Sequence, residues 1–203
     1  MVRKVVVTVI ATVQIASDGQ SALPFDRLEP VHLATAGTIG VYYFDYGTDA
    51  RMNSDDLGDF YVVQIPLSGT ARITSGAEEF DSTMSIASIL QPGRSATMQW
   101  HEGQSQLIIR LARRSLEEHL QEILGSPLGE PLRFEPQMEL GRPAIRGWRE
   151  AVELLEHEVA NHTAITADSA AMEEFELIVL SQFLSAQPNN YSARLRGLAQ
   201  SLT

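Results

Sequence analysis

The stretch Gln106–Leu120, QLIIRLARRSLEEHL, is where the hydrophobic pattern of the chain changes its period. Up to Leu111 the residues alternate between a mixed face and an apolar face, with the period of two that is typical of a β-strand. After Ser115 the apolar residues recur at the three-to-four spacing of a helix. The sequence therefore predicts an α+β domain, in which an antiparallel β-sandwich or β-barrel over residues 38–112 precedes a helical part.

Turn signals divide the β part at intervals of about ten residues, as in sandwiches and barrels. They are Ser68-Gly69, Ser75-Gly76 and the corner Gln91–Arg94. The expected strands cover residues 38–46, 60–67, 70–74, 85–90, 96–100 and 104–111. Pro66 lies inside one of them and predicts an edge strand or a bulge, because proline has no N–H for a ladder hydrogen bond.

Two helices are expected in the middle of the helical part. Ser115-Leu-Glu-Glu118 has the pattern of a capping box and predicts a helix that ends near Leu124, before Gly125. Pro143 suits the first turn of the next helix. The apolar stripe of that helix is Ile145, Trp148, Val152, Leu155 and Val159.

The last expected helix begins near Thr166 or Asp168 and ends near Ala186. It is apolar on more than one side, which indicates burial between two surfaces. We expect these surfaces to be the β part and a second copy of the chain, so the sequence predicts a homodimer. The candidate dimerisation residues are Met172, Phe175, Val179 and Phe183.

Composition limits the class of function. The 203 residues carry a net charge of −11 and contain no cysteine. A surface this acidic repels nucleic-acid phosphates and anionic lipid, so this chain by itself is not expected to bind DNA, RNA or a membrane. The absence of cysteine excludes disulfides and thiolate metal sites and fits a cytoplasmic protein.

Residues 1–21 are expected to form an N-terminal arm, an added strand or a leader before the domain. A short signal sequence is the competing interpretation, because Arg3 and Lys4 precede a largely apolar block. Thr8, Thr12 and Gln14 interrupt that block. The expected organisation is then a β part over 22–112, a helical subdomain over 113–190 and a linker or tail over 191–203.

The histidines do not predict a metal site. A site inside a barrel needs two histidines on one strand in a His-x-His pattern, and none of the five histidines stands in that pattern. His119 and His157 fall on expected helices among glutamates and are predicted to be solvated. We expect no metal and no cofactor.

The acidic segments do not predict catalysis either. The segment 49–59 fits a calcium-binding loop poorly, because Leu57 would occupy a ligand position, and it is predicted to be a polar hairpin loop. Glu78, Glu79 and Asp81 are predicted to lie at a solvated turn. The sequence also has no nucleophile elbow and no phosphate-binding loop, so we predict that the chain is not an enzyme.

The strand over 104–111 has two faces of different character. Ser105, Leu107, Ile109 and Leu111 form one face, which suits packing against helices. Gln104, Gln106, Ile108 and Arg110 form the other face, and Ala96, Met98 and Trp100 share a face of the preceding strand. Two interpretations remain open. The mixed face lines a ligand cavity, since buried polar groups need partners, or it is exposed and side chains fill the barrel.

Three motifs in order resemble the N-terminal effector-binding domain of AraC-type transcription regulators. They are FYVVQIPLSG over 60–69, LQPG over 90–93 and the stretch over 106–120, and the resemblance covers residues 22–192. It implies a cupin-like barrel that binds a small effector without a metal, followed by helices that mediate dimerisation. In that family a separate C-terminal domain with helix-turn-helix units reads DNA, and this sequence stops where that domain would begin.

The resemblance also implies a ligand pocket on the strands. By strand position its residues are Met98, Gln106, Ile108 and Arg110, with Phe44 and Gln64 as further candidates and Trp100 against the apolar body of the ligand. The function expected is effector sensing. The alternatives are a cupin-fold enzyme, such as an isomerase or dioxygenase, and a dimerisation module with a filled barrel.

Overall fold

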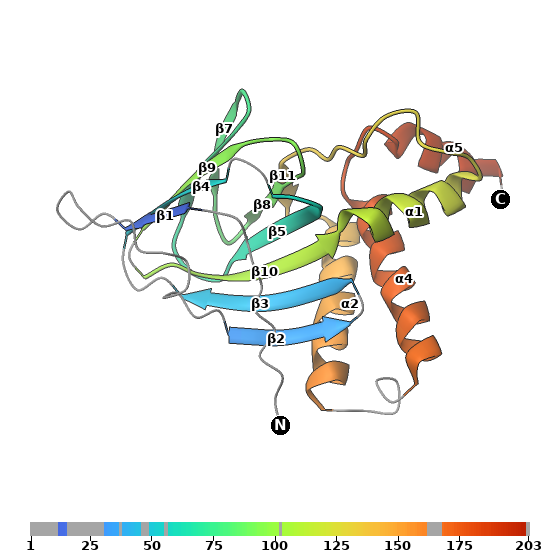
Figure 1. Cartoon of the computed structure of the whole chain (residues 1–203), viewed down its shortest axis with the longest axis horizontal. Helices are drawn as coiled ribbons and strands as arrows, with labels where there is room; N and C mark the ends of the chain where they lie inside the picture. The colour runs from blue at the N-terminus through green and yellow to red at the C-terminus, as the bar shows by residue number, and fades with distance from the viewer. Residues whose placement is uncertain are drawn as a thin grey trace.

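Two antiparallel sheets face each other, and helices cover the outer side of the larger sheet (Figure 1). The computed structural model describes residues 12–15, 31–36, 38–45, 49–54, 57–101, 103–161 and 168–201. Over these residues the predicted order, an antiparallel β part followed by helices, is confirmed. None of the helices described is both long and apolar enough to cross a bilayer.

The elements are as follows. The five-stranded sheet has the order β1 (Thr12–Ile15), β4 (Ala50–Ser54), β9 (Ala96–Trp100), β6 (Ala71–Ser75) and β7 (Glu78–Ser82). The six-stranded sheet has the order β11 (Gln137–Glu139), β8 (Ile86–Leu90), β5 (Phe60–Pro66), β10 (Ser105–Ala112), β3 (Ile39–Asp45) and β2 (Val31–Ala36). The helices described are α1 (Arg113–Leu124), α2 (Pro143–Ala160), α4 (Ser169–Ala186) and α5 (Ser192–Ser201).

Two strands lie where the sequence predicted loops. β4 occupies the first half of the acidic segment 49–59 and pairs with β1 and β9. β7 carries Glu79 and Asp81 and forms a hairpin with β6, from which Arg72 binds both carboxylates. The predicted loop was therefore wrong over 50–54, and the predicted turn was wrong at β7, because pairing and cross-strand contacts outweigh the weak strand propensity of acidic residues. Glu78, Glu79 and Asp81 are exposed to solvent, as predicted.

Two further predictions concern strand edges. β5 lies between β8 and β10, so the prediction of an edge strand at Pro66 was wrong. β8 pairs with β5 only over Val62–Gln64, so the absent N–H of Pro66 interrupts no ladder bond to β8. β1 is an added strand at the edge of the five-stranded sheet, and the other residues of the segment 1–21 lie outside the described residues.

Three helix ends show what the sequence predicted well and what it did not. α1 begins at Arg113 with Ala112 at its N-cap and no side-chain cap, so the capping box at Ser115 is not formed. Asp168 caps α4 by accepting a hydrogen bond from the N–H of Ala170 at 2.9 Å, as its position suggested. The expected tail contains a helix, α5, rather than an irregular linker.

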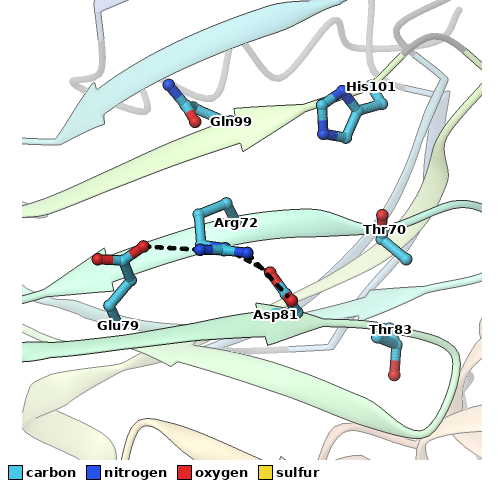
Figure 2. Close-up of a pocket in the computed structure, with 7 residues that line it drawn as sticks. All are labelled: Thr70, Arg72, Glu79, Asp81, Thr83, Gln99 and His101. Atoms are coloured by element: carbon cyan, nitrogen blue, oxygen red, sulfur yellow. Dashed lines mark hydrogen bonds and ion pairs between the residues drawn. The ribbon is translucent and has the colours of Figure 1, made fainter.

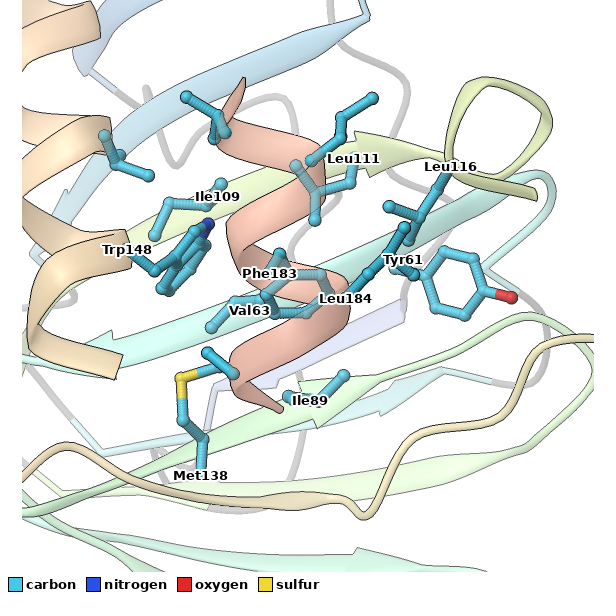
Figure 3. Close-up of a cluster of buried hydrophobic side chains, with 14 of the residues drawn as sticks. Tyr61, Val63, Ile89, Ile109, Leu111, Leu116, Met138, Trp148, Phe183 and Leu184 are labelled. Atoms are coloured by element: carbon cyan, nitrogen blue, oxygen red, sulfur yellow. The ribbon is translucent and has the colours of Figure 1, made fainter. Parts of the chain in front are cut away.

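The outer side of the six-stranded sheet and the helices share one apolar cluster (Figure 3). The ring centroids of Trp148 in α2 and Phe183 in α4 are 5.0 Å apart, and both side chains point toward the sheet. Val179 is also fully buried there. Val179 and Phe183 therefore cannot contact a second copy, because they have no exposed surface, whereas Met172 and Phe175 are partly buried against the same cluster.

Polar contacts attach the helices to each other and to the sheet. The buried carboxylate of Glu176 in α4 accepts hydrogen bonds from the N–H (3.0 Å) and the hydroxyl of Thr38, next to β3. His119 in α1 is hydrogen-bonded to the Ser181 hydroxyl of α4 at 2.6 Å, and only 11% of its side chain is exposed. The prediction of a solvated His119 was wrong because α4 packs on that face of α1, whereas His157 is exposed as predicted.

Candidate functional site

Strand β10 divides its side chains between the two sides of the six-stranded sheet. Ile109 and Leu111 belong to the cluster that the helices cover. Ile108 packs against a second apolar cluster, which lies between the two sheets and includes Met98 and Trp100 of the opposite sheet. The mixed face therefore points into the space between the sheets, as the first of the two open interpretations requires.

The predicted pocket residues come together along this inner side. Gln106 pairs with Phe44 of β3 and with Pro66 of β5, and Ile108 pairs with Gln64 of β5. The opposite sheet contributes the buried side chains of Met98 and Trp100 on β9. The seven residues thus lie on facing strands, and whether they contact a ligand remains a prediction.

The polar members of this set lie at two different ends of the sandwich. Gln106 is the second residue of β10, beside the turn from β9, and Arg110 lies three residues before α1 begins. Figure 1 shows that α1 follows the far end of β10. Four residues of strand separate their Cα atoms by about 13 Å at the usual rise. Ile108 lies between them on the same side of β10, and Phe60, which stacks on the guanidinium of Arg110, pairs with Ala112 on the side away from Gln106. One small polar group cannot therefore contact both side chains.

At the Arg110 end, the guanidinium has an aromatic neighbour. Its central carbon lies 4.1 Å from the ring centroid of Phe60, a cation–π distance. Its Nε is buried without a hydrogen-bond partner, and no described carboxylate lies within ion-pair distance. A partly buried guanidinium in this state can bind a carboxylate or a carbonyl oxygen of a ligand.

At the Gln106 end, the structure adds a residue that the predicted pocket did not contain. Gln104 is fully buried, and neither its Oε1 nor its Nε2 has a hydrogen-bond partner. The alternation of β10 placed Gln104 on the mixed face, but the sequence could not show that its amide is buried. Gln64 differs, because its Oε1 accepts a hydrogen bond from the Ser88 hydroxyl at 2.9 Å.

Two grooves lie outside the space between the sheets. One, of about 380 Å³, crosses the outer face of the five-stranded sheet, where Arg72 lies between Glu79 and Asp81 (Figure 2). Hydrogen bonds to these carboxylates raise the pKa of Arg72. The other, of about 340 Å³, contains Arg94 and Arg133, which pair with Glu78 and Glu130 respectively. All three groove arginines thus have acidic partners, unlike Arg110.

The described residues contain no group of three histidine, aspartate or glutamate side chains placed to hold a metal ion. His101, next to the Gln106 end, is exposed and lies 3.9 Å from Asp49 on the surface. The arrangement between the sheets consists of a guanidinium, amides and apolar side chains. These groups can hold a ligand by charge, hydrogen bonds and apolar contact.

Comparisons with known proteins show the family of the chain. The sequence model of the AraC-binding-like domain family matches residues 13–185. A probable thc operon regulatory protein from Rhodococcus erythropolis is 26% identical over 165 residues, which cover 80% of this chain and 50% of that protein. The chain therefore spans about half the length of this curated relative.

Two solved structures are similar to this chain to different degrees. The AraC-like transcriptional activator CuxR has a TM-score of 0.53 at 11% identity, covering 88% of this chain and 63% of that one. An apo form of ToxT from Vibrio cholerae has a TM-score of 0.47 at 13% identity, covering 72% of this chain and 54% of that one. The similarity to CuxR concerns the fold, and it confirms the expected cupin-like sandwich followed by helices.

Proposed function

The chain belongs to the AraC-binding-like domain family, the ligand-binding domain of AraC-type regulators, and we propose that it binds a small-molecule effector between its two sheets. The proposed role is sensing without catalysis or a cofactor. DNA would be read by a domain outside this chain, and the protein would act in the cytoplasm. We keep the expected sensor over 22–112 and helices over 113–190 as part of this proposal, with two changes: the segment 1–21 adds strand β1 to the sensor, and α5 takes the place of the linker expected from 191.

The observation that carries this proposal is the state of Arg110. The residue points between the sheets, stacks on Phe60 at 4.1 Å and has a buried Nε without a partner. Desolvating a guanidinium costs free energy unless an acceptor compensates for it, and an effector carboxylate or carbonyl supplies one. The apolar body of the effector would then extend past Ile108 toward Met98 and Trp100.

Sensing further requires that the effector favour one of two states of the protein, since equal affinity for both would change nothing. We propose that the second state differs in dimerisation through the helical part. On α4, Leu177 and Ile178 are 42% and 49% exposed and directly follow Glu176, which holds the helix to Thr38. Together with the partly buried Met172 and Phe175, these residues replace Val179 and Phe183 as candidates for the contact.

The test compares two arginines that differ in their partners. In Arg110→Ala, binding of an anionic aromatic probe, benzoate, should weaken at least about tenfold, because a charge-assisted hydrogen bond contributes on the order of 1.5–3 kcal/mol. The control, Arg72→Ala, removes an arginine that already forms ion pairs with Glu79 and Asp81, and it should leave benzoate binding unchanged. Isothermal calorimetry or ligand-observed NMR on the whole chain measures both. If Arg110→Ala and the unmodified chain bind benzoate with equal affinity, the assignment of this site is overturned.

A further inference from the structure

The buried amide of Gln104 opposes folding, and the proposed anion site does not use it. Its side chain has no exposed surface, and both polar atoms lack hydrogen-bond partners. Burying an amide without partners costs on the order of 1–3 kcal/mol, and a leucine of similar size would avoid this cost. A function for this amide would explain why the fold carries it.

The backbone on both sides of Gln104 is held in place. The Gln104 N–H donates to the carbonyl of His101 at 3.2 Å. Ser68 accepts a hydrogen bond from the N–H of Ser105 at 3.0 Å and donates one to the carbonyl of Gly103 at 2.8 Å. The two turns at this end of the sandwich are thereby joined, so the backbone that carries the amide is held in place.

Gly69 shows how closely the two turns approach. It has a φ of +67°, and a Cβ built there would lie 3.2 Å from the Cβ of Gln104. A side chain at position 69 would therefore push on Gln104, in a backbone conformation that already favours glycine. The close contact fixes the position of Gln104 from the side of the β5–β6 turn.

The surroundings of Gln104 favour a neutral group over an anion. The residues at this end of β9, β10 and β3 on the inner side are Trp100, Gln106 and Phe44, all buried and uncharged. Arg110 is six residues away in the sequence, five of them along β10, which span about 17 Å at the usual strand rise. A carboxylate placed beside Gln104 would lose its hydration without gaining a cation, which is strongly unfavourable.

We propose that the Gln104 end of the inter-sheet space recognises a neutral group that carries a hydrogen-bond donor and an acceptor on adjacent atoms, of which a carboxamide is the simplest example. The Oε1 of Gln104 would accept from the N–H of the ligand, and its Nε2 would donate to the ligand carbonyl. This inference rests on the proposed function, because it places part of the effector between the sheets. It adds a second position with a chemistry different from that of Arg110.

The experiment uses benzamide and benzoate, which share a ring and differ in the charge of the polar group. Ligand-observed NMR at millimolar concentration measures their binding to the whole chain. In Gln104→Leu, benzamide binding should weaken at least about tenfold, since two hydrogen bonds are lost, and benzoate binding should stay unchanged. In Arg110→Ala, benzoate binding should weaken instead, and benzamide binding should stay unchanged. The control, Gln99→Leu, removes an exposed amide from the outer face of β9 and should affect neither probe.

The outcomes separate this inference from the proposed function. Benzamide binding that is absent, or that Gln104→Leu leaves intact, overturns the Gln104 inference, and a benzoate site at Arg110 stands regardless. Benzoate binding that does not depend on Arg110 overturns the anion site instead. Because Gln104→Leu removes an unpaired amide, its thermal midpoint should not fall, and this measurement shows that the variant is folded. If the midpoint does fall, Gln104→Met, with its flexible and similarly sized side chain, replaces it in the same assay.

Discussion

The two sides of the six-stranded sheet use the same strands for different purposes. Toward the helices, β10 presents Ile109 and Leu111 to a cluster that is almost entirely apolar. Toward the other sheet, the same part of the chain presents Gln104 and Arg110, whose buried amide and Nε lack partners. The helix side also has buried polar atoms without partners, the Nε1 of Trp148, the Nδ1 of His119 and the Oε1 of Gln187. Each of these side chains makes another contact, however: Trp148 packs on Phe183, His119 is hydrogen-bonded to Ser181, and the Nε2 of Gln187 donates to two backbone carbonyls.

The difference indicates where stability and function are located. Packing of large apolar side chains gives the helix side its free energy of folding. The inner side keeps polar groups whose burial opposes folding, and natural proteins usually tolerate such groups at functional sites. The predictions below test this division by stability measurements on the two sides.

The largest effect is expected on the helix side. Trp148→Ala should lower the free energy of unfolding by about 3–5 kcal/mol, because it leaves a cavity against Phe183 and the sheet. Urea unfolding followed by circular dichroism measures the change. Leu154→Ala on the same helix, where the side chain is 46% exposed, should have a much smaller effect. Similar losses in the two variants would contradict the role of this cluster as the main core.

An intermediate effect is expected at Tyr61, a polar group of the helix side that has a partner. Its hydroxyl donates to the carbonyl of Leu132 at 2.8 Å. Tyr61→Phe should cost about 1–2 kcal/mol near neutral pH, because that buried carbonyl loses its donor.

The cost of Tyr61→Phe should also depend on pH. Burial, and then the carboxylate of Glu117, raise the pKa of Tyr61 above its usual value of 10.0. Above pH 10 the unfolded chain therefore ionises this tyrosine more readily than the folded chain, so the wild type loses stability as the pH rises and the phenylalanine variant loses less. Urea unfolding near neutral pH and above pH 10 measures the difference in stability between the wild type and Tyr61→Phe. A difference that does not become smaller above pH 10 would refute the raised pKa of Tyr61.

The smallest effect is expected on the inner side. Arg110→Met should change the free energy of unfolding by no more than about 1 kcal/mol in either direction. The variant loses a cation–π contact that contributes about 1 kcal/mol, but it no longer has to bury a charged guanidinium, which opposes folding. The same urea experiment applies. A loss comparable to that of Trp148→Ala would show that Arg110 is part of the core rather than of a binding site.

Much of the β part could be predicted because its signals are local. Turn residues such as Ser68-Gly69 and the corner at Gln91–Arg94 mark strand ends wherever the strands are placed. β4 and β7 escaped prediction because their acidic sequences become strands only by pairing with distant neighbours. The capping box at Ser115 failed for a similar reason, since α1 continues directly from β10 and begins before the predicted cap.

The pocket prediction shows the same limit at the level of side chains. The period of two correctly placed Gln106, Ile108 and Arg110 on one side of β10, because side-chain alternation is a property of a single strand. It could not show that Gln104 is buried without a partner or that Gln64 is bonded to Ser88, because both depend on residues far away in the sequence.

By itself, the sequence determined that a β part precedes a helical part, which side chains lie on the two faces of β10, and the apolar stripe of α2. These features follow from the geometry of a single strand or helix, which a few neighbouring residues specify. Only the tertiary structure decided that Phe183 belongs to the core instead of a dimer contact, and that Arg110 and Gln104 lie at opposite ends of the inner space. Both depend on which distant segments pack together, and only the folded chain brings those segments into contact.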